Sequence, residues 1–538
     1  MSELVHDFIF DAARRTPRAP ALSHGAARLD YAALAQMIDA AAQALLATGL
    51  ARGERVAIYL EKRIENVAAM FGAAAAGGVF VPVNPLLKPD QVVHILTDCN
   101  VRILLTSVAR LALLAPLLPY CVDLHTILLV DGDGDGDGDG DGAALPQTPA
   151  QRRWDLAARG TPADADAPAH AAHRRIDVDV AAILYTSGST GKPKGVVLSH
   201  RNLVAGANSV ARYLALTPAD RILSVLPLSF DYGLSQLTSA FYAGAAVVLM
   251  NYLFPRDIAR AIEAEGITGL AAVPPLWHQL AQLPWPASSS LRYLTNSGGA
   301  MPRTTLDALR AALPSAEVFL MYGLTEAFRS TYLAPCELDR RPDSIGRAIP
   351  NAQVMVVRSD GTACAANEPG ELVHRGALVA LGYWNDPAKT AERFRPAPGQ
   401  DPALPLLEMA VWSGDIVRQD EEGFLYFLGR NDDIIKVSGY RVSPGEIEDV
   451  AHATGLVAEA VAFGVTHPGL GQAIVLLAVA RDPALSAAAL SSACARRLPA
   501  YMLPTHIALQ ADPFPRNPNG KIDRTLLRAP FRTMFESI

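Results

Sequence analysis

One loop of the sequence has the composition of a phosphate-binding loop. Residues 185–195 have the sequence YTSGSTGKPKG and follow an apolar run that predicts a strand. Glycines let backbone amides point toward anionic oxygens, while hydroxyl and ammonium groups add donors and positive charge. A kinase-type loop would need Ser or Thr after Gly-Lys, and here Pro193 follows Lys192. A G-x-G-x-x-G dinucleotide pattern is also absent. The loop therefore indicates phosphate binding, and composition alone leaves a solvated Gly/Ser loop as the alternative.

Alternating strand and helix patterns surround this loop. Ala-rich stretches such as residues 31–46 and 256–265 predict helices between short apolar strands. This alternation is typical of an α/β fold with largely parallel sheets. We expect the strands at residues 56–60, 79–83, 103–106, 182–185, 222–226, 246–250, 291–295 and 318–321.

Two later regions depart from the alternating pattern. Residues 352–376 combine short strands with turn residues, which predicts a small β-rich subdomain. After residue 430 we expect a compact α+β unit with helices at 447–453 and 485–498 and strands at 460–465 and 473–479. We therefore predict an N-terminal domain of residues 1–430 and a C-terminal domain of residues 431–538.

The bulk composition excludes several classes of protein. With 538 residues the chain is too long for one ordinary domain, and its net charge of -7 without a Lys/Arg block disfavours nucleic-acid binding. Five scattered cysteines without a C-x-x-C spacing indicate reduced thiols in a cytoplasmic protein. The longest uncharged run, residues 67–83, is short for a membrane span and contains Gly-Gly and Pro. It predicts a buried helix followed by a buried strand.

Residues 131–142 consist of six Asp-Gly repeats. Because Gly is flexible and the Asp charges repel one another, we expect a disordered surface loop. Calcium binding is the alternative, but the twelfth loop position lacks the Glu that an EF-hand loop requires.

Five motifs, in this order, resemble those of the AMP-forming adenylating superfamily, which comprises acyl-CoA synthetases, nonribosomal adenylation domains and luciferases. They are the loop above, MYGLTE at 321–326, WSGD at 412–415, GRNDDIIKVSGYRVSPGEIE at 429–448 and NPNGKID at 517–523. The chain also resembles a bacterial subgroup of acyl-CoA ligases associated with exosortase and exopolysaccharide gene clusters. The resemblance implies a large α/β N-terminal domain and a small, mobile α+β C-terminal lid.

This resemblance implies two half-reactions. A carboxylate attacks the α-phosphorus of ATP, in the presence of Mg²⁺, to give an acyl-adenylate and pyrophosphate. A thiol, from coenzyme A or from the phosphopantetheine of a separate carrier protein, then displaces AMP. A stand-alone amino-acid ligase that loads such a carrier is the main alternative. A luciferase-like oxygenase and an inactive binding homologue are remote ones.

The resemblance also assigns catalytic and nucleotide-binding roles. Lys521 is implied as the lysine that bridges the attacking carboxylate and the α-phosphate, with Thr325 and Glu326 beside the phosphates. Glu326 and Thr190 are implied as magnesium ligands, because hard cations prefer oxygen. The residues implied to bind ATP or AMP are Thr186, Ser187, Gly188, Ser189, Thr190, Gly191, Lys194, Gly298, Gly299, Ala300, Tyr322, Asp415 and Arg430.

Two further residues are implied in the change between half-reactions. Asp432 matches the hinge about which the small domain rotates, and a hinge must absorb a change in backbone dihedral angles. Gly439 is implied to border the channel through which the thiol enters.

The identity of the acid depends on Asp231 and Arg329. A buried carboxylate needs a counter-charge, which is either an ammonium group of the substrate, as in amino-acid-activating relatives, or Arg329. If the two side chains pair, the acid need not carry an amine. If Arg329 is free, it can hold a second carboxylate of the acid. The expected acyl pocket comprises Phe230, Asp231, Tyr232, Ser235, Thr295, Ser297, Met321, Arg329 and Ser330.

Overall fold

The computed structural model describes residues 2–131, 149–154, 171–186, 193–286, 289–430, 434–515, 522 and 524–535, without the side chains of residues 430 and 525. The Asp-Gly repeats therefore lie outside the described residues from position 132 onward. Among the described residues, no helix is long and apolar enough to cross a membrane. The uncharged run at 67–83 forms parts of a buried helix, α3 (Ile64–Ala76), and a buried strand, β4 (Val79–Pro82), as predicted.

A nine-stranded mixed sheet carries most of the predicted site. Its neighbours from β1 to β14 are parallel, whereas β2, β15 and β16 are antiparallel to their partners. The carboxyl ends of parallel strands meet at one edge of a sheet, where ligands bind in folds of this class. The spatial order is β16 (Arg347–Ala348), β15 (Phe328–Leu333), β14 (Glu317–Leu324), β13 (Tyr293–Asn296), β12 (Gly269–Ala272), β10 (Arg221–Ser224), β11 (Ala246–Leu249), β1 (Pro20–His24), β2 (Ala27–Asp30).

An eight-stranded sheet carries the predicted phosphate loop, between β8 and β9. Strands β3 to β8 pair in parallel, and β9 and β19 are antiparallel to their neighbours. The spatial order is β19 (Gly382–Tyr383), β9 (Lys194–Ser199), β8 (Val180–Thr186), β4, β3 (Arg55–Tyr59), β5 (Val101–Thr106), β6 (Thr126–Leu129), β7 (Ala150–Arg153).

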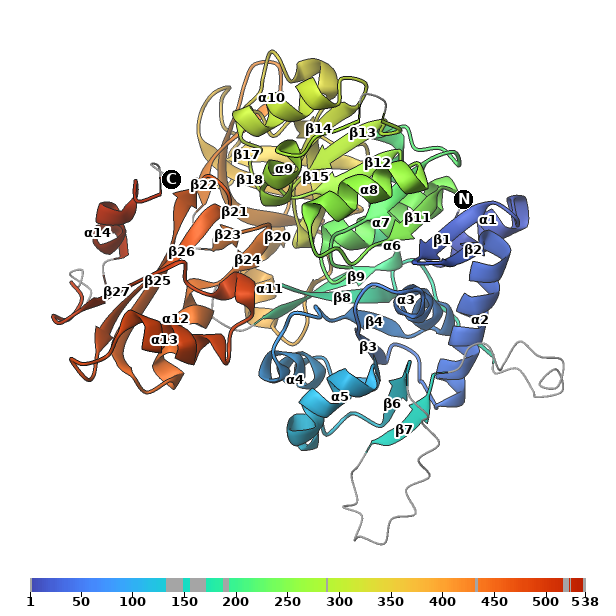
Figure 1. Cartoon of the computed structure of the whole chain (residues 1–538). Helices are drawn as coiled ribbons and strands as arrows, with labels where there is room; N and C mark the ends of the chain where they lie inside the picture. Colours follow the sequence, from blue (N-terminus) through green and yellow to red (C-terminus); the bar gives the residue numbers. More distant parts are fainter. Residues whose placement is uncertain are drawn as a thin grey trace, which may run out of the picture.

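Helices join the two sheets through one buried cluster. Residues of α2 (Tyr31–Ala47), α3, α6 (His200–Tyr213) and α7 (Asp231–Ala243) share this cluster with strands of both sheets. In Figure 1, α3 lies beside β4 and α2 runs along the right side of the molecule. Burying apolar area from two sheets on one set of helices fixes the relative position of the two sheets. The other helices of this part are α1 (Asp7–Arg15), α4 (Pro89–Asp98), α5 (Val108–Leu114), α8 (Pro255–Glu265), α9 (Pro274–Ala281) and α10 (Arg303–Ala312).

The β-rich region predicted at 352–376 forms part of a five-stranded antiparallel sheet. Its strands are β17 (Ala352–Val357), β18 (Gly370–Gly376), β21 (Met409–Gln419), β20 (Phe394–Pro396) and β22 (Leu425–Arg430), with α11 (Pro387–Arg393) beside it. This sheet matters for function because β21 carries Asp415 and β22 ends at Arg430.

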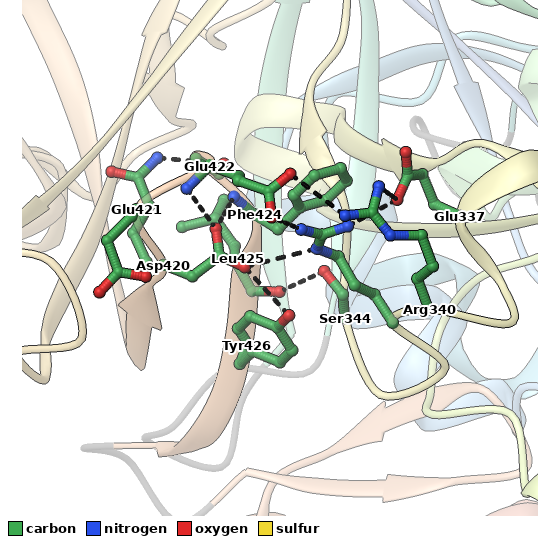
Figure 2. Close-up of polar contacts among 12 residues, drawn as sticks. Glu337, Arg340, Ser344, Asp420, Glu421, Glu422, Phe424, Leu425 and Tyr426 are labelled. Carbon is green, nitrogen blue, oxygen red and sulfur yellow. Dashed lines mark hydrogen bonds and ion pairs between the residues drawn. The ribbon is translucent and has the colours of Figure 1, made fainter.

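A cluster of charged and polar side chains attaches the β21–β22 hairpin to the rest of the molecule. The buried Arg341 side chain lies 2.7 Å from Glu337 and also contacts Glu422. The hydroxyl of Ser344 donates to the carbonyl of Leu425 at 2.8 Å. Figure 2 shows Glu337, Arg340 and Ser344 facing the turn of this hairpin. These contacts fix the strand pair that carries Asp415 and Arg430, two of the residues implied to bind ATP or AMP.

The C-terminal residues form a second five-stranded sheet, drawn in orange and red in Figure 1. Its strands are β24 (Tyr440–Val442), β23 (Ile435–Val437), β26 (Gly471–Ala480), β25 (Val457–His467) and β27 (His506–Gln510), and its helices are α12 (Pro444–Ala453), α13 (Ala487–Ala495) and α14 (Arg524–Arg528). The predicted helix at 485–498 is shorter than expected at both ends. It begins at 487 because the Ser486 side chain caps it by accepting a hydrogen bond from the backbone N–H of Ala489.

Candidate active site

The carboxylate of Glu326 is buried and contacts both β19 of the eight-stranded sheet and β24 of the C-terminal sheet. Glu326 is 4% exposed and lies in a short 3₁₀ turn between β14 and β15. One of its oxygens accepts a hydrogen bond from the hydroxyl of Tyr383 at 2.8 Å, and the other lies 3.1 Å from Nη1 of Arg441. Burial alone would raise the pKa of Glu326. The Arg441 charge and the Tyr383 hydrogen bond outweigh burial and hold this pKa below its usual value, so the carboxylate is ionised.

Glu326 fits a magnesium–phosphate site of the kind predicted. Magnesium is usually held by one or two carboxylates together with substrate phosphates rather than by an all-protein cage. Among the described residues, no group of three or more His, Cys, Asp or Glu side chains could hold a metal. Glu326, a buried and ionised carboxylate, has the chemistry of one such ligand. The guanidinium of Arg441 already contacts one of its oxygens, so a metal ion and Arg441 would compete for it.

Tyr322 and Asp415 are joined in the region where the nucleotide is expected. The Tyr322 hydroxyl donates a hydrogen bond to the carboxylate of Asp415, and both side chains are buried. The Tyr322 ring lies nearly parallel to the ring of His374, with centroids 6.2 Å apart. Burial lowers the pKa of His374 to about 4, so the imidazole is neutral. The arrangement presents an aromatic face and a carboxylate side by side, which suits a nucleoside.

The segment that contains Gly298, Gly299 and Ala300, which are implied to bind ATP or AMP, approaches the segment that follows β23. Residues 297–300 follow β13, and Gly298 and Gly439 both have positive φ angles, of 81° and 83°. A Cβ atom on Gly439 would lie 2.5 Å from Cγ1 of Val273, and one on Gly298 would lie 3.6 Å from the Cα of Gly439. A side chain at position 439 would therefore collide, and glycine lets the two segments approach.

Asp231 faces a small cavity together with Thr325. Asp231 is the first residue of α7, and Oγ1 of Thr325 lies 3.4 Å from its Oδ1. The cavity has a volume of about 80 Å³ and is also lined by Thr186, Phe230 and Gly439. Burial raises the pKa of Asp231, and the positive charge of Arg329 opposes this rise. The acidic residue predicted for the acyl pocket thus lies beside a residue of the predicted phosphate region.

The remaining residues of the expected acyl pocket lie near one another on α7, β13, β14 and β15. Tyr232 hydrogen-bonds to both the carbonyl and the hydroxyl of Thr295, each at 2.7 Å. The sulfur of Met321 accepts a hydrogen bond from Tyr213 at 2.9 Å. Ser235, Ser297 and Ser330 are buried. A mixed polar and aromatic environment results.

Arg329 lies within this environment without a polar partner. Its side chain is 1% exposed, and none of its three side-chain nitrogens has a hydrogen-bond partner among the described residues. The guanidinium carbon lies 4.3 Å from the ring centre of Phe328 and 5.0 Å from that of Tyr232. No ion pair joins Arg329 to Asp231. The structure therefore favours the second alternative from the sequence, a free guanidinium.

A larger cavity adjoins the small one. It has a volume of about 430 Å³ and shares Phe230, Gly439 and Tyr440 with the small cavity. Its wall includes Lys62, whose ammonium donates to the carbonyl of Val225 at 2.8 Å. Burial lowers the pKa of Lys62 to about 8. The two cavities thus share Gly439, the residue implied to border the thiol channel.

The predicted phosphate loop and the predicted C-terminal residues are only partly described. Thr186 and Lys194 flank the phosphate loop and are described, and Nζ of Lys194 lies 5.4 Å from the ring centre of Tyr383. The residues that lie outside the description are Ser187, Gly188, Ser189, Thr190, Gly191, Asp432, Lys521 and the side chain of Arg430.

Sequence reasoning missed two residues that contact Glu326. Tyr383 lies in a two-residue strand without a distinctive pattern, so the sequence held no signal for it. Arg441 lies in the segment GYR of the motif at 429–448, and its positive charge could have indicated a contact with a carboxylate of the site.

Comparison with known proteins gives matches along most of the chain. The model of the AMP-binding enzyme family matches residues 9–384, and the model of the AMP-binding enzyme C-terminal domain matches residues 446–521. An L-proline–[L-prolyl-carrier protein] ligase from Pseudomonas fluorescens is 32% identical over 536 residues, which cover 98% of this chain and 99% of that protein.

Two solved structures are also similar. The o-succinylbenzoate CoA synthetase MenE from Bacillus subtilis, bound to a product analogue, is 26% identical with a TM-score of 0.80 and 97% of each chain covered. VinN in complex with L-aspartate is 30% identical with a TM-score of 0.65, covering 79% of this chain and 98% of that one. These relatives do not place the chain in the exosortase-associated subgroup, which stays a prediction.

Proposed function

From its membership of the AMP-binding enzyme family, to which this chain belongs, we propose that it joins a small carboxylic acid to a thiol through an acyl-adenylate. The observation that carries the proposal is the small cavity lined by Asp231 and Thr325, which shares Gly439 with a larger cavity. An acid, a phosphate group and a thiol can all reach this place.

In the first half-reaction a carboxylate oxygen of the acid forms a bond to the α-phosphorus of ATP, and the bond to the β-phosphate oxygen breaks. We assign the adenosine to Tyr322 and Asp415 and the phosphates to Thr325, Glu326 and the loop at 186–191. Bound magnesium neutralises charge on the phosphates. Lys521 contributes a positive charge where negative charge develops, which lowers the barrier.

In the second half-reaction the thiol sulfur attacks the acyl carbonyl, AMP leaves, and the thiol proton passes to solvent. The structure has the segment around Gly439 packed against Val273, beside both cavities. This arrangement supports the thiol step, because the larger cavity shares Gly439 with the small cavity that Asp231 lines. The change between the two steps is assigned to a rotation of residues 431–538 about Asp432.

The acid is proposed to carry an amino group. Asp231 is a carboxylate whose only hydrogen-bond donor among the described side chains is Thr325, at 3.4 Å. An ammonium group of the substrate would supply the missing counter-charge. The relatives named for proline and bound to L-aspartate are consistent with an amino-acid substrate.

The acceptor is proposed to be the phosphopantetheine of a separate carrier protein, with coenzyme A as the alternative. The match to the prolyl-carrier protein ligase over nearly the full length of both chains supports a carrier, and the match to MenE supports coenzyme A. A cytoplasmic location is part of the same proposal, since all five cysteines are free.

The test is ATP–pyrophosphate exchange across a panel of amino acids, hydroxy acids, short fatty acids and aryl acids. We expect exchange with one class of small amino acid and its loss in Glu326→Ala. The exposed Arg303→Ala, which also removes one charge, is the matched control. No exchange with any acid would favour an inactive binding homologue, and oxygen consumption after adenylation would favour an oxygenase.

A further inference from the structure

We propose that Arg329 binds a second carboxylate of the substrate, so that the acid activated by this chain is a short amino dicarboxylic acid. The inference rests on the proposed function and specifies the substrate of the same site. It starts from one observation, a guanidinium that is 1% exposed and has no polar partner among the described residues.

A buried guanidinium without hydrogen bonds is costly for a protein. Charged groups leave water only at a large free-energy cost, and buried ones are normally paired or hydrogen-bonded. Nε, Nη1 and Nη2 of Arg329 are all buried and unpaired. A guanidinium presents its donors in a planar fork that matches a carboxylate through two parallel hydrogen bonds. The missing partner therefore has the chemistry of a carboxylate.

The neighbours of Arg329 do not supply that partner. The rings of Phe328 and Tyr232 lie 4.3 Å and 5.0 Å from the guanidinium carbon and stabilise its charge through their faces, but they accept no hydrogen bond from its edge in this geometry. The hydroxyl of Tyr213 lies near enough to Arg329 to interact with its charge, but it donates to the sulfur of Met321 at 2.9 Å, and no Arg329 nitrogen has a partner in hydrogen-bond geometry among the described residues. Asp231 is near enough for the Arg329 charge to act on its pKa, but no ion pair forms between them.

The positions of the two charges match the proposed ligand. Asp231 begins α7 and Arg329 lies on β15, with its guanidinium carbon 5.0 Å from the ring centre of Tyr232, the residue after Asp231. Asp231 also lies beside Thr325, where the reacting carboxylate meets the phosphate. An acid bound here would direct its reacting carboxylate toward Thr325, its ammonium toward Asp231 and its second carboxylate toward Arg329.

The surrounding polar groups suit a short side chain. The hydroxyl of Ser330, the residue after Arg329, is buried without a partner among the described residues, and the hydroxyl of Ser235 lies 3.3 Å from that of Ser239. These hydroxyls can supply further donors to a carboxylate. The cavity at Asp231 is about 80 Å³ and Arg329 does not line it, so the second carboxylate has to move the packing around Tyr232 to reach the guanidinium, and we expect only a few carbon atoms between the two carboxylates.

Direct binding tests the charge pattern independently of turnover. Calorimetry with the full chain should compare L-aspartate and L-glutamate with L-asparagine, L-alanine and succinate. We expect at least one dicarboxylic amino acid to bind tenfold or more tightly than asparagine, its neutral isostere, and than succinate, which lacks the amine. Equal binding of asparagine and aspartate, with no gain for glutamate, would overturn the proposal.

Variants at position 329 provide a second test of the proposal. Arg329→Met should reduce kcat/KM for the dicarboxylic acid a hundredfold or more and remove the discrimination against asparagine. Arg329→Lys should retain part of that discrimination, because one charged donor remains. If Arg329 were merely structural, Arg329→Met would lower the melting temperature and leave the ratio of aspartate to asparagine unchanged, which contradicts the proposal. Should Arg329→Met fail to fold, the same ratio measured in Arg329→Lys and Arg329→Gln decides.

The outcomes separate this inference from the function on which it rests. Exchange with neutral amino acids but with no dicarboxylic one overturns the inference and leaves the ligase function in place. Binding of a dicarboxylic amino acid without exchange for any acid supports the inference and overturns the function.

Discussion

The guanidinium of Arg441 lies 3.1 Å from the carboxylate of Glu326, although 115 residues separate them in sequence. Arg441 lies on β24 of the C-terminal sheet, and Glu326 lies at the end of β14 in the nine-stranded sheet. Glu326 is also the residue proposed to hold magnesium. If Glu326 holds magnesium as proposed, its carboxylate would bind a metal ion when ATP is bound, and it contacts the Arg441 guanidinium when the C-terminal segment is packed as it is here.

Replacement of Arg441 should impair the thiol step selectively. In Arg441→Met the buried carboxylate of Glu326 loses its counter-charge in this conformation only, so the conformation is disfavoured. Loss of one partner of a buried pair costs on the order of 3 kcal/mol, and each 1.4 kcal/mol is a factor of ten. We expect thioester formation from preformed adenylate to slow about tenfold to a hundredfold, with ATP–pyrophosphate exchange nearly unchanged. Arg441→Lys is the control, and equal losses in both steps would contradict the assignment.

Removal of Lys521 should have the opposite effect. Lys521→Ala removes the positive charge assigned to the attacking carboxylate and the α-phosphate, so adenylate formation should fall by a factor of about a hundred or more. Thioester formation from a chemically prepared adenylate should persist. Single-turnover assays of each step measure the two effects. Unimpaired exchange in Lys521→Ala, with Arg303→Ala as the charge-matched control, would refute the role.

A proline at the predicted hinge should separate the half-reactions. Asp432→Pro fixes φ near −65° and removes a backbone N–H, which restricts rotation about this position. We expect adenylation to continue and thioesterification to stall, whereas Asp432→Ala should permit both. The ratio of pyrophosphate release to thioester formation measures this, and a ratio near that of the unaltered protein in Asp432→Pro would disprove the hinge.

The contact between α4 and α12 should depend on pH through Glu446. Nε2 of Gln91 donates to the Glu446 carboxyl at 2.9 Å, and burial raises the Glu446 pKa to about 7. A raised pKa means that the packed form binds the proton more tightly, so its stabilisation is complete below the usual pKa near 4.5 and is lost as pH rises through about 7. We expect hydrogen exchange of residues 434–453 to increase from pH 5.5 to 8 after correction for intrinsic rates.

Glu446→Gln should flatten this profile, because an amide keeps the contact without titrating. Asp482→Asn, at an exposed position, is the matched control and should leave the profile intact. A pH profile that is the same in Glu446→Gln and in the unaltered protein would assign the dependence to another group.

The alternating pattern of apolar runs predicted the α/β fold, because buried parallel strands appear as continuous apolar segments. The region at 352–376 was recognised from its short strands, and the helix at 31–46 from its length and composition; the structure confirms both. The ends of elements were less predictable. The helix expected at 447–453 begins at Pro444, since proline is favoured in the first turn of a helix.

The contacts within the candidate site were beyond sequence reasoning. Tyr383 and Glu326 are 57 residues apart, and only the packing of β19 against β9 brings the tyrosine to the carboxylate. The sequence also could not predict whether Arg329 forms an ion pair with Asp231, because this depends on how far apart α7 and β15 lie. The pattern of residue types predicts which side chains face a pocket, but it does not predict which of those side chains contact one another.

The unpartnered guanidinium of Arg329 has a consequence for how this scaffold can evolve. Since Arg329 donates no hydrogen bond to the described part of the chain, the fold gains little from its charge, and an apolar side chain of similar volume should cost no stability. Most mutations are lost to selection because they destabilise the protein. If Arg329 selects the acid as proposed, a substitution at this position would be tolerated by the fold, and a single mutation could change the acid that is activated. The nucleotide region, where Tyr322 is bonded to Asp415 and Glu326 to Tyr383, offers no such freedom.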